Sequence, residues 1–179
     1  YFNQDGILKH TSFDRYNVRA NTEFTVNDAI TVGENFTVSY SEEIGIDNQG
    51  VGNTISMAFR MPPLVPVRDI RGNYAGTGVG GMGNADNPVA MLERGQNDKS
   101  RRLRAFGNAY LQAEFLENFR FKSTIGIDYN TVHSSGFTFI NFESSEPISS
   151  NSYNEYTDYN SNWTWSNTLE FNNTFSDLH

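Results

Sequence analysis

Charged side chains recur at every second position in several stretches of the sequence. Residues two apart lie on the same face of a β-strand, so each set would share one face. Both acidic and basic residues occur in this pattern, so we expect ion pairs between strands. Arg102 and Arg104, for example, could pair with Glu23 or Asp128 on other strands. The full set is Arg15, Arg19, Glu23, Arg102, Arg104, Arg120, Lys122 and Asp128.

The residue types that usually carry catalysis or bind metals do not form a recognisable arrangement. His10, His133 and His179 are widely separated and lack metal-ligand spacing, and cysteine is absent from the sequence. Acidic residues are plentiful, but no spacing marks two of them as the carboxylate pair of a glycosidase. We therefore predict no catalytic residues, no metal and no cofactor.

Two local motifs invite sharper interpretations that their surroundings do not support. The glycine-rich segment 72–83 lacks the Gly-Lys-Ser/Thr ending of a phosphate-binding loop, so an ordinary loop is the better interpretation. The basic run 99–104 is part of an alternating pattern, which distributes its charges over two faces of a strand. The formal net charge of −8 also argues against nucleic acid as a partner.

The elements that position these charges are predicted to be long β-strands. Apolar and polar residues alternate with period two in five stretches, each roughly 11–15 residues long, against a usual strand of about five or six. The stretches are 13–26, 30–40, 102–115, 119–130 and 163–175.

The connections between these stretches alternate between short and long. Residues 27–29 and 116–118 are turn-sized, which predicts two hairpins. Residues 44–98 form a connection far longer than the usual loop, with a short helix expected around 53–60, and a second long segment covers about 144–158. Short turns on one side and long loops on the other are typical of bacterial outer-membrane barrels, so 44–98 is predicted to be extracellular.

The two faces of the predicted strands differ in chemistry. The charged set cannot all face hydrocarbon, so its side is predicted to line an aqueous lumen and the apolar side to meet lipid. Glu34 is an exception, because its parity puts it on the apolar side. Predicted membrane-interface aromatics are Trp163, Trp165, Phe115, Phe119 and Phe175, and predicted loop contacts with ligand or partner are Tyr153, Tyr156 and Tyr159.

Composition is compatible with a membrane wall built from strands. The hydrophobic fraction is 37% over 179 residues, and no window approaches the roughly 18 consecutive apolar residues of a membrane helix. Barrel strands are apolar only at alternate positions, so their average hydropathy stays modest. The predicted fold class is all-β, with antiparallel strands from part of a large transmembrane β-barrel.

Several segments, in order, resemble the barrel of SusC/RagA-like TonB-dependent transporters. Residues 2–7 and 13–16 carry the first part of the likeness, together with Arg19 and Asn21. The remaining segments are 63–67, 72–74, 87–90, 92–93, 106–110, 126–129 and 163–169. The resemblance covers nearly the whole chain, and its weight comes from the order and spacing of pieces that are each weak.

The resemblance implies a barrel of about 22 strands around a plug. Such transporters lie in the bacterial outer membrane of Bacteroidetes, contact its lipid, and usually pair with a SusD-like surface lipoprotein. They import oligosaccharides or peptides with energy delivered through TonB. Residues 1–179 contain no plug domain and too few strands to close such a barrel, so they are interpreted as a partial barrel, and transport would belong to the whole protein.

Two other classes of function remain open from the sequence. A secreted β-sandwich that binds carbohydrate would account for the aromatic residues, although it accommodates the strand length and the 44–98 loop poorly. A jelly-roll glycoside hydrolase would need a convergent pair of carboxylates, which the pattern does not identify.

Overall fold

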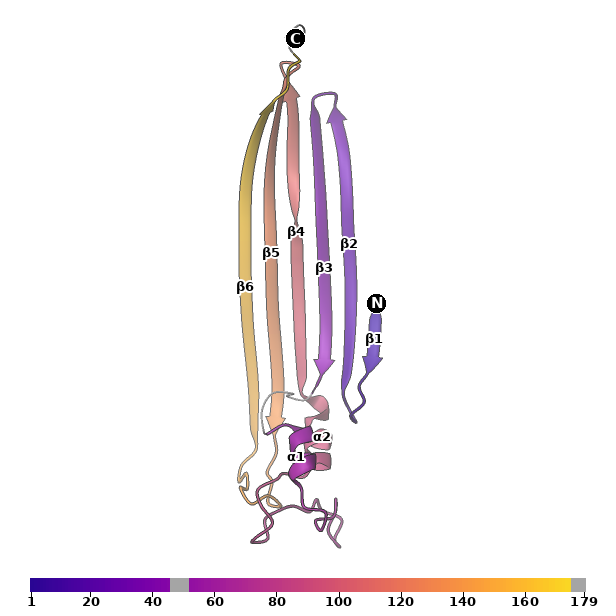
Figure 1. The fold of residues 1–179 in the computed structure, drawn as a ribbon, viewed down its shortest axis with the longest axis vertical. Coiled ribbons are helices and arrows are strands. Elements are labelled where there is room, and N and C mark those ends of the chain that lie inside the picture. Colours follow the sequence, from indigo (N-terminus) through magenta and orange to yellow (C-terminus); the bar gives the residue numbers. More distant parts are fainter. Residues whose placement is uncertain (46–51, 175–179) are drawn as a thin grey trace, which may run out of the picture. The chain divides into compact units, whose positions relative to one another are not determined.

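The fold is an antiparallel β-sheet with helical segments in one of its connections. The structure is a computed structural model that describes residues 1–45 and 52–174. The strands pair in the order of the sequence, as Figure 1 shows. The elements are β1 (Phe2–Asp5), β2 (Ser12–Asn27), β3 (Ile30–Ile44), α1 (Thr54–Arg60), α2 (Pro88–Arg94), a 3₁₀ turn (Gly95–Asn97), β4 (Lys99–Phe115), β5 (Phe119–Thr138) and β6 (Ser152–Phe171). The predicted all-β antiparallel architecture is confirmed.

The long strands exceed their predicted lengths. β2, β3 and β4 have 16, 15 and 17 residues, and β5 and β6 have 20 each. A tilted strand needs about 9–11 residues to cross a bilayer, so β5 and β6 are about twice that length. β1 was not predicted, because four residues are too few to show a convincing alternation; it pairs with the first residues of β2.

The two predicted hairpins are present, and each turn has a local cause. In the β2–β3 turn, the Asn27 carboxamide oxygen accepts a hydrogen bond from the Ala29 amide at 2.9 Å, which is an Asx-type turn. In the β4–β5 turn, Leu116 and Glu117 have φ of 51° and 58°. Two successive left-handed residues match the twist of an antiparallel pair, as in a type I′ turn.

The chain divides into two compact units, which are described separately. The strand unit comprises 16–40, 102–131 and the described part of 158–179, and therefore most of the alternating stretches. The loop unit comprises 1–15, 41–101 and 132–157, and therefore both helices and the long connections.

The loop unit contains a small core around its two helices. α1 begins after Asn53, whose side chain accepts from the Ser56 amide at 2.8 Å, and the helix expected at 53–60 is confirmed. α2 begins after Asn87 with Pro88 in its first turn, and it packs against α1. Met57, Ala85 and Ala90 are buried there. Neither helix of the described residues is long and apolar enough to span a membrane.

The long connection starts one residue later than predicted. Ile44 is the last residue of β3 and Lys99 the first of β4, so the connection is 45–98 rather than 44–98. Its residues 46–51 lie outside the described part of the chain. Its extracellular location stays a prediction.

Candidate functional site

The polar face of the strand unit contains the predicted charged residues, joined across strands. Arg104 on β4 donates two hydrogen bonds to Asp128 on β5, Nε to Oδ1 at 3.1 Å and a terminal nitrogen to Oδ2 at 3.0 Å. Arg120 pairs with Glu114 at 2.9 Å and lies 3.7 Å from Glu170 on β6. The ion pairing expected of Arg104 is therefore present, and Asp128 is its acceptor.

A second network on this face joins β2, β4 and β5 through one tyrosine, whose side chain crosses over β3. The Tyr110 hydroxyl on β4 donates to the Glu23 carboxylate on β2, and the Lys122 ammonium on β5 lies 4.0 Å from the Tyr110 ring centroid. To reach β2 the Tyr110 side chain passes over Gly33 of β3, where a Cβ would overlap the ring. Gly33 is needed for that close approach. Tyr110 was on the predicted polar face, but its linking role was missed because a sequence does not show which residue lies opposite it.

The other predicted lumen residues are less connected. Arg15 belongs to the loop unit, where its guanidinium lies 5.8 Å from the Phe2 ring centroid. Arg19 and Arg102 are exposed, and within the described residues neither forms an ion pair. Some of the predicted lumen residues therefore form ion pairs across strands, and others are exposed.

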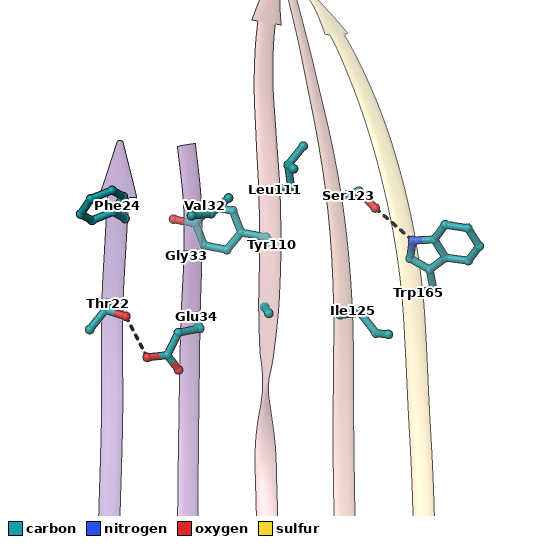
Figure 2. Close-up of a pocket in the computed structure, with 11 residues that line it drawn as sticks. Thr22, Phe24, Val32, Gly33, Glu34, Tyr110, Leu111, Ser123, Ile125 and Trp165 are labelled. Carbon is teal, nitrogen blue, oxygen red and sulfur yellow. Dashed lines mark hydrogen bonds between the residues drawn. The ribbon is translucent and has the colours of Figure 1, made fainter. Parts of the chain in front are cut away.

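The opposite face of the strand unit carries aliphatic and aromatic side chains. A groove of about 580 Å³ lies on this face. The residues that line it include Phe24, Val32, Leu111, Ile125 and Trp165 (Figure 2). Two polar contacts lie within it: the Trp165 indole N–H donates to Ser123 at 3.0 Å, and the Thr22 hydroxyl donates to Glu34 at 2.8 Å. Glu34 thus lies among these apolar side chains, as its parity indicated.

Aromatic residues gather near the short-turn end of this face. The Phe115 and Phe119 rings stack with centroids 5.6 Å apart, and Phe119 lies 4.9 Å from Phe171. Phe175 lies outside the described residues. Trp163 and Trp165 are exposed on β6. Contact of these rings with a membrane interface stays a prediction.

The tyrosines predicted to lie in a loop lie in a strand instead. Tyr153, Tyr156 and Tyr159 are all part of β6, which begins at Ser152. Alternation along a strand puts Tyr156 on the opposite face from the other two, and their contact with ligand or partner stays a prediction. The predicted loop location was wrong because asparagine and aspartate are uncommon in strands, and here pairing with β5 outweighs that preference.

The loop unit has a polar cluster that the sequence did not single out. The Tyr74 hydroxyl donates to Glu93 at 2.5 Å. The Arg68 and Arg94 guanidinium groups lie 4.4 and 5.2 Å from the Tyr74 ring centroid. Arg94 pairs with Glu143 at 2.5 Å. The hydrogen bond from Tyr74 lowers the pKa of Glu93 and raises that of Tyr74. The only signal was that Tyr74 and Glu93 lie in segments carrying the family resemblance.

The strands change character where the loop unit begins. On β4, Leu103 and the odd-numbered residues after it are mostly apolar, whereas Arg101 and Lys99 continue the same parity as charges. Both bind Glu42 of β3, at 2.9 and 2.5 Å. The apolar side chains of this face of β4 therefore begin at Leu103. The residues of β4 before it, from Lys99 to Arg101, carry charges on that face, which suits contact with water.

Comparisons with known proteins agree with this arrangement. No protein-family model matches the chain. TonB-dependent receptor P3 of Formosa agariphila is 29% identical over 133 residues, which is 70% of this chain and 13% of that protein. TonB-dependent receptor P39 of the same organism is 25% identical over 182 residues, covering 100% of this chain and 16% of that protein. The chain is therefore similar in sequence to a segment of each of these two receptors. These relatives are receptors and not enzymes.

Solved structures show the same fold. The RagAB peptide transporter matches with a TM-score of 0.68 at 20% identity, covering 96% of this chain and 20% of that one. The closed-closed state of the RagAB peptide importer gives 0.67 at 19% identity, covering 93% and 19%. The predicted resemblance and fold class, a part of a transporter barrel, are confirmed. The chain spans only about one sixth or less of the curated receptors it matches.

Proposed function

We propose that this chain is a piece of the barrel wall of an outer-membrane TonB-dependent transporter that imports oligosaccharides or peptides. The whole transporter would work with a SusD-like surface lipoprotein and receive energy through TonB. The relatives named TonB-dependent receptors and the fold shared with the RagAB peptide transporter support this proposal.

The observation that carries the proposal is the contrast between the two faces of the strand unit. One face carries cross-strand networks of charged residues, and the other carries Phe24, Leu111, Trp165 and similar side chains in the open. In the described part of this unit, Gly33 is the one buried residue, so no second layer covers either face. A sandwich module would bury one of them. A membrane wall instead presents one face to lipid and one to an aqueous lumen.

The two faces are tested by labelling neighbouring residues of β4. In the full-length receptor, Leu111→Cys and Gln112→Cys place single thiols on opposite faces; the chain itself has no cysteine. Spin labels at these positions report collisions with oxygen, which partitions into lipid, and with a water-soluble nickel chelate. We expect the label at 111 to favour oxygen and the label at 112 the chelate. Equal access of the chelate to both positions would overturn the proposal.

A further inference from the structure

A second hollow lies on the polar face of the strand unit, apart from the Tyr110 network. It has a volume of about 360 Å³ and lies between β4, β5 and β6. Most of the side chains that line it have even parity and therefore belong to the charged face: Phe106, Asn108, Thr124, Asp128, Asn162 and Thr164. Ile127 and Trp163, of odd parity, also line it.

Gly126 lies among the residues that line the hollow and keeps it open. A Cβ at this position would lie 2.7 Å from the Thr164 hydroxyl oxygen, closer than real Cβ atoms approach a neighbour. A larger side chain would therefore occupy the space between β5 and β6. With glycine at position 126, no side chain of β5 enters this space next to Thr164.

The charges at the hollow are balanced among themselves. Arg104 and Asp128 hold each other through two hydrogen bonds, and the Arg104 guanidinium lies 5.1 Å from the Phe106 ring centroid. Phe106 is still 43% exposed. An incoming ligand thus meets an aromatic ring beside a neutralised ion pair, which disfavours a ligand with a net charge.

The uncharged polar groups are in turn available to a ligand. Asn108 and Thr124 are half-buried, and among the described residues no side-chain hydrogen bond engages either of them. Asn162 donates to Asn160 at 2.6 Å and keeps its own carboxamide oxygen as an acceptor. The hollow therefore combines an aromatic ring with side chains that can both donate and accept hydrogen bonds.

We propose that this hollow is a binding subsite for one neutral pyranose ring of an oligosaccharide moving along the polar face; this rests on the proposed function. A pyranose ring has a C–H face that packs on Phe106 and hydroxyl groups that both donate and accept, matching Asn108, Thr124 and Asn162. One common way to recognise an extended peptide, its addition to a free strand edge, is not open at β4 and β5, because both lie within the sheet. Binding is weak, because a transport path must release its cargo.

The subsite is tested in the full-length receptor in detergent by saturation-transfer NMR. The probes are the methyl glycosides of glucose, galactose and mannose, with a blocked neutral tripeptide as the competing class. We expect transfer to the ring C–H protons of at least one glycoside. Gly126→Leu and Asn108→Ala should each reduce that transfer at least fivefold, and Gln112→Ala, on the same face of β4 but outside the hollow, should leave it unchanged.

Two results would overturn the subsite. One is that no glycoside shows transfer that depends on Gly126 and Asn108. The other is that the tripeptide shows that dependence instead. Asn108→Ala removes only a carboxamide, so it remains informative if Gly126→Leu fails to fold.

The labels at positions 111 and 112 separate this failure from failure of the proposed function. Labels that report lipid at 111 and water at 112, together with absent glycoside binding, overturn the subsite alone. Equal aqueous access at both positions overturns the barrel wall, whatever the glycosides do.

Discussion

The strand unit and the loop unit are stabilised in different ways. In the loop unit, apolar residues such as Met57, Ala85 and Ala90 are buried together with polar ones such as Thr77 and Asn87. In the described strand unit, only Gly33 is buried, and large apolar side chains lie open on one face. The first is arranged as a small folded body, and the second as a wall between two environments.

This difference shows where each unit gets its stability. The loop unit buries side chains and satisfies their polar atoms internally, and no buried side-chain nitrogen or oxygen of the described residues lacks a partner. The strand unit satisfies its backbone by sheet pairing and leaves its apolar face to be covered by something outside the described chain. Substitutions should therefore act through internal hydrogen bonds in one unit and through cross-strand contacts in the other.

The largest expected effect is that of Asn87→Ala in the loop unit. The Asn87 carboxamide donates to the Val67 and Ala75 carbonyls at 2.8 and 2.7 Å, and accepts from the first amides of α2. Its loss removes a helix cap and the donor to the Ala75 carbonyl, while the Val67 carbonyl keeps the Ala75 amide as a donor at 3.1 Å. The substitution should cost about 2–4 kcal/mol. Hydrogen exchange of segments 67–75 and 88–94 in the full-length receptor measures this cost.

The matched control for this prediction is Asn97→Ala, an exposed asparagine with no side-chain hydrogen bond among the described residues. If Asn87→Ala changed hydrogen exchange in these segments no more than Asn97→Ala does, the loop unit would not depend on the internal hydrogen bonds of Asn87. Hydrogen exchange in the parts of β2–β6 that belong to the strand unit should stay as in the wild type, which would show that the two units are stabilised independently.

The next effect is expected in the strand unit, from Gly33→Val. The new side chain would overlap the Tyr110 ring and displace its hydroxyl from Glu23. Overpacking of this kind costs about 1–3 kcal/mol. Urea unfolding of the receptor in detergent micelles, followed by gel mobility without heating, measures the change. The double variant Gly33→Val with Tyr110→Ala should recover part of the stability, and a lack of any recovery would argue against this contact as the cause.

The strands and their faces could be predicted because alternation is a local property. Parity alone put Arg104 and Asp128 on one face, and the structure joins them. Parity also put Glu34 on the apolar side, where it accepts from Thr22. The start of β6 was missed because 152–162 is rich in residues that avoid strands, and pairing with a neighbour supplied what local preference did not.

The loop unit was much harder to predict, since its contacts join distant residues. Glu93 is 19 residues from Tyr74, and Glu143 is 49 from Arg94. Nothing in either segment specifies the other. α2 did leave a local signal, because Asn87 followed by Pro88 is a typical helix start. That signal was used only for the family resemblance and not to predict the helix.

A smaller effect is expected for Glu143→Gln in the loop unit. Glu143 is 13% exposed and pairs with Arg94, which is 26% exposed, at 2.5 Å. Loss of the charge weakens a partly buried, charge-assisted hydrogen bond and should cost about 1–2 kcal/mol. Hydrogen exchange of segment 139–148 measures this cost. Glu146→Gln is the control, because Glu146 is exposed and forms no ion pair among the described residues. Equal exchange in the two variants would show that the pair is not important for the loop unit.

The smallest effect should be a dependence on acid that is confined to the loop unit. The Tyr74 hydroxyl, then the Arg68 charge, hold the pKa of Glu93 below its ordinary value of 4.5, and Lys9 and His10 act in the same direction. A depressed folded-state pKa means that this stabilisation is fully present above 4.5 and is lost as the pH falls through the lower folded value. The protection factors of the amides near Tyr74, corrected for the pH dependence of intrinsic exchange, should therefore fall on acidification. The fall should be less steep in Tyr74→Phe than in the wild type, and the exposed Tyr153→Phe should behave as the wild type. An unchanged acid profile in Tyr74→Phe would show that another group controls the opening, and the loop unit would then owe its acid response to its ion pairs and not to this hydrogen bond.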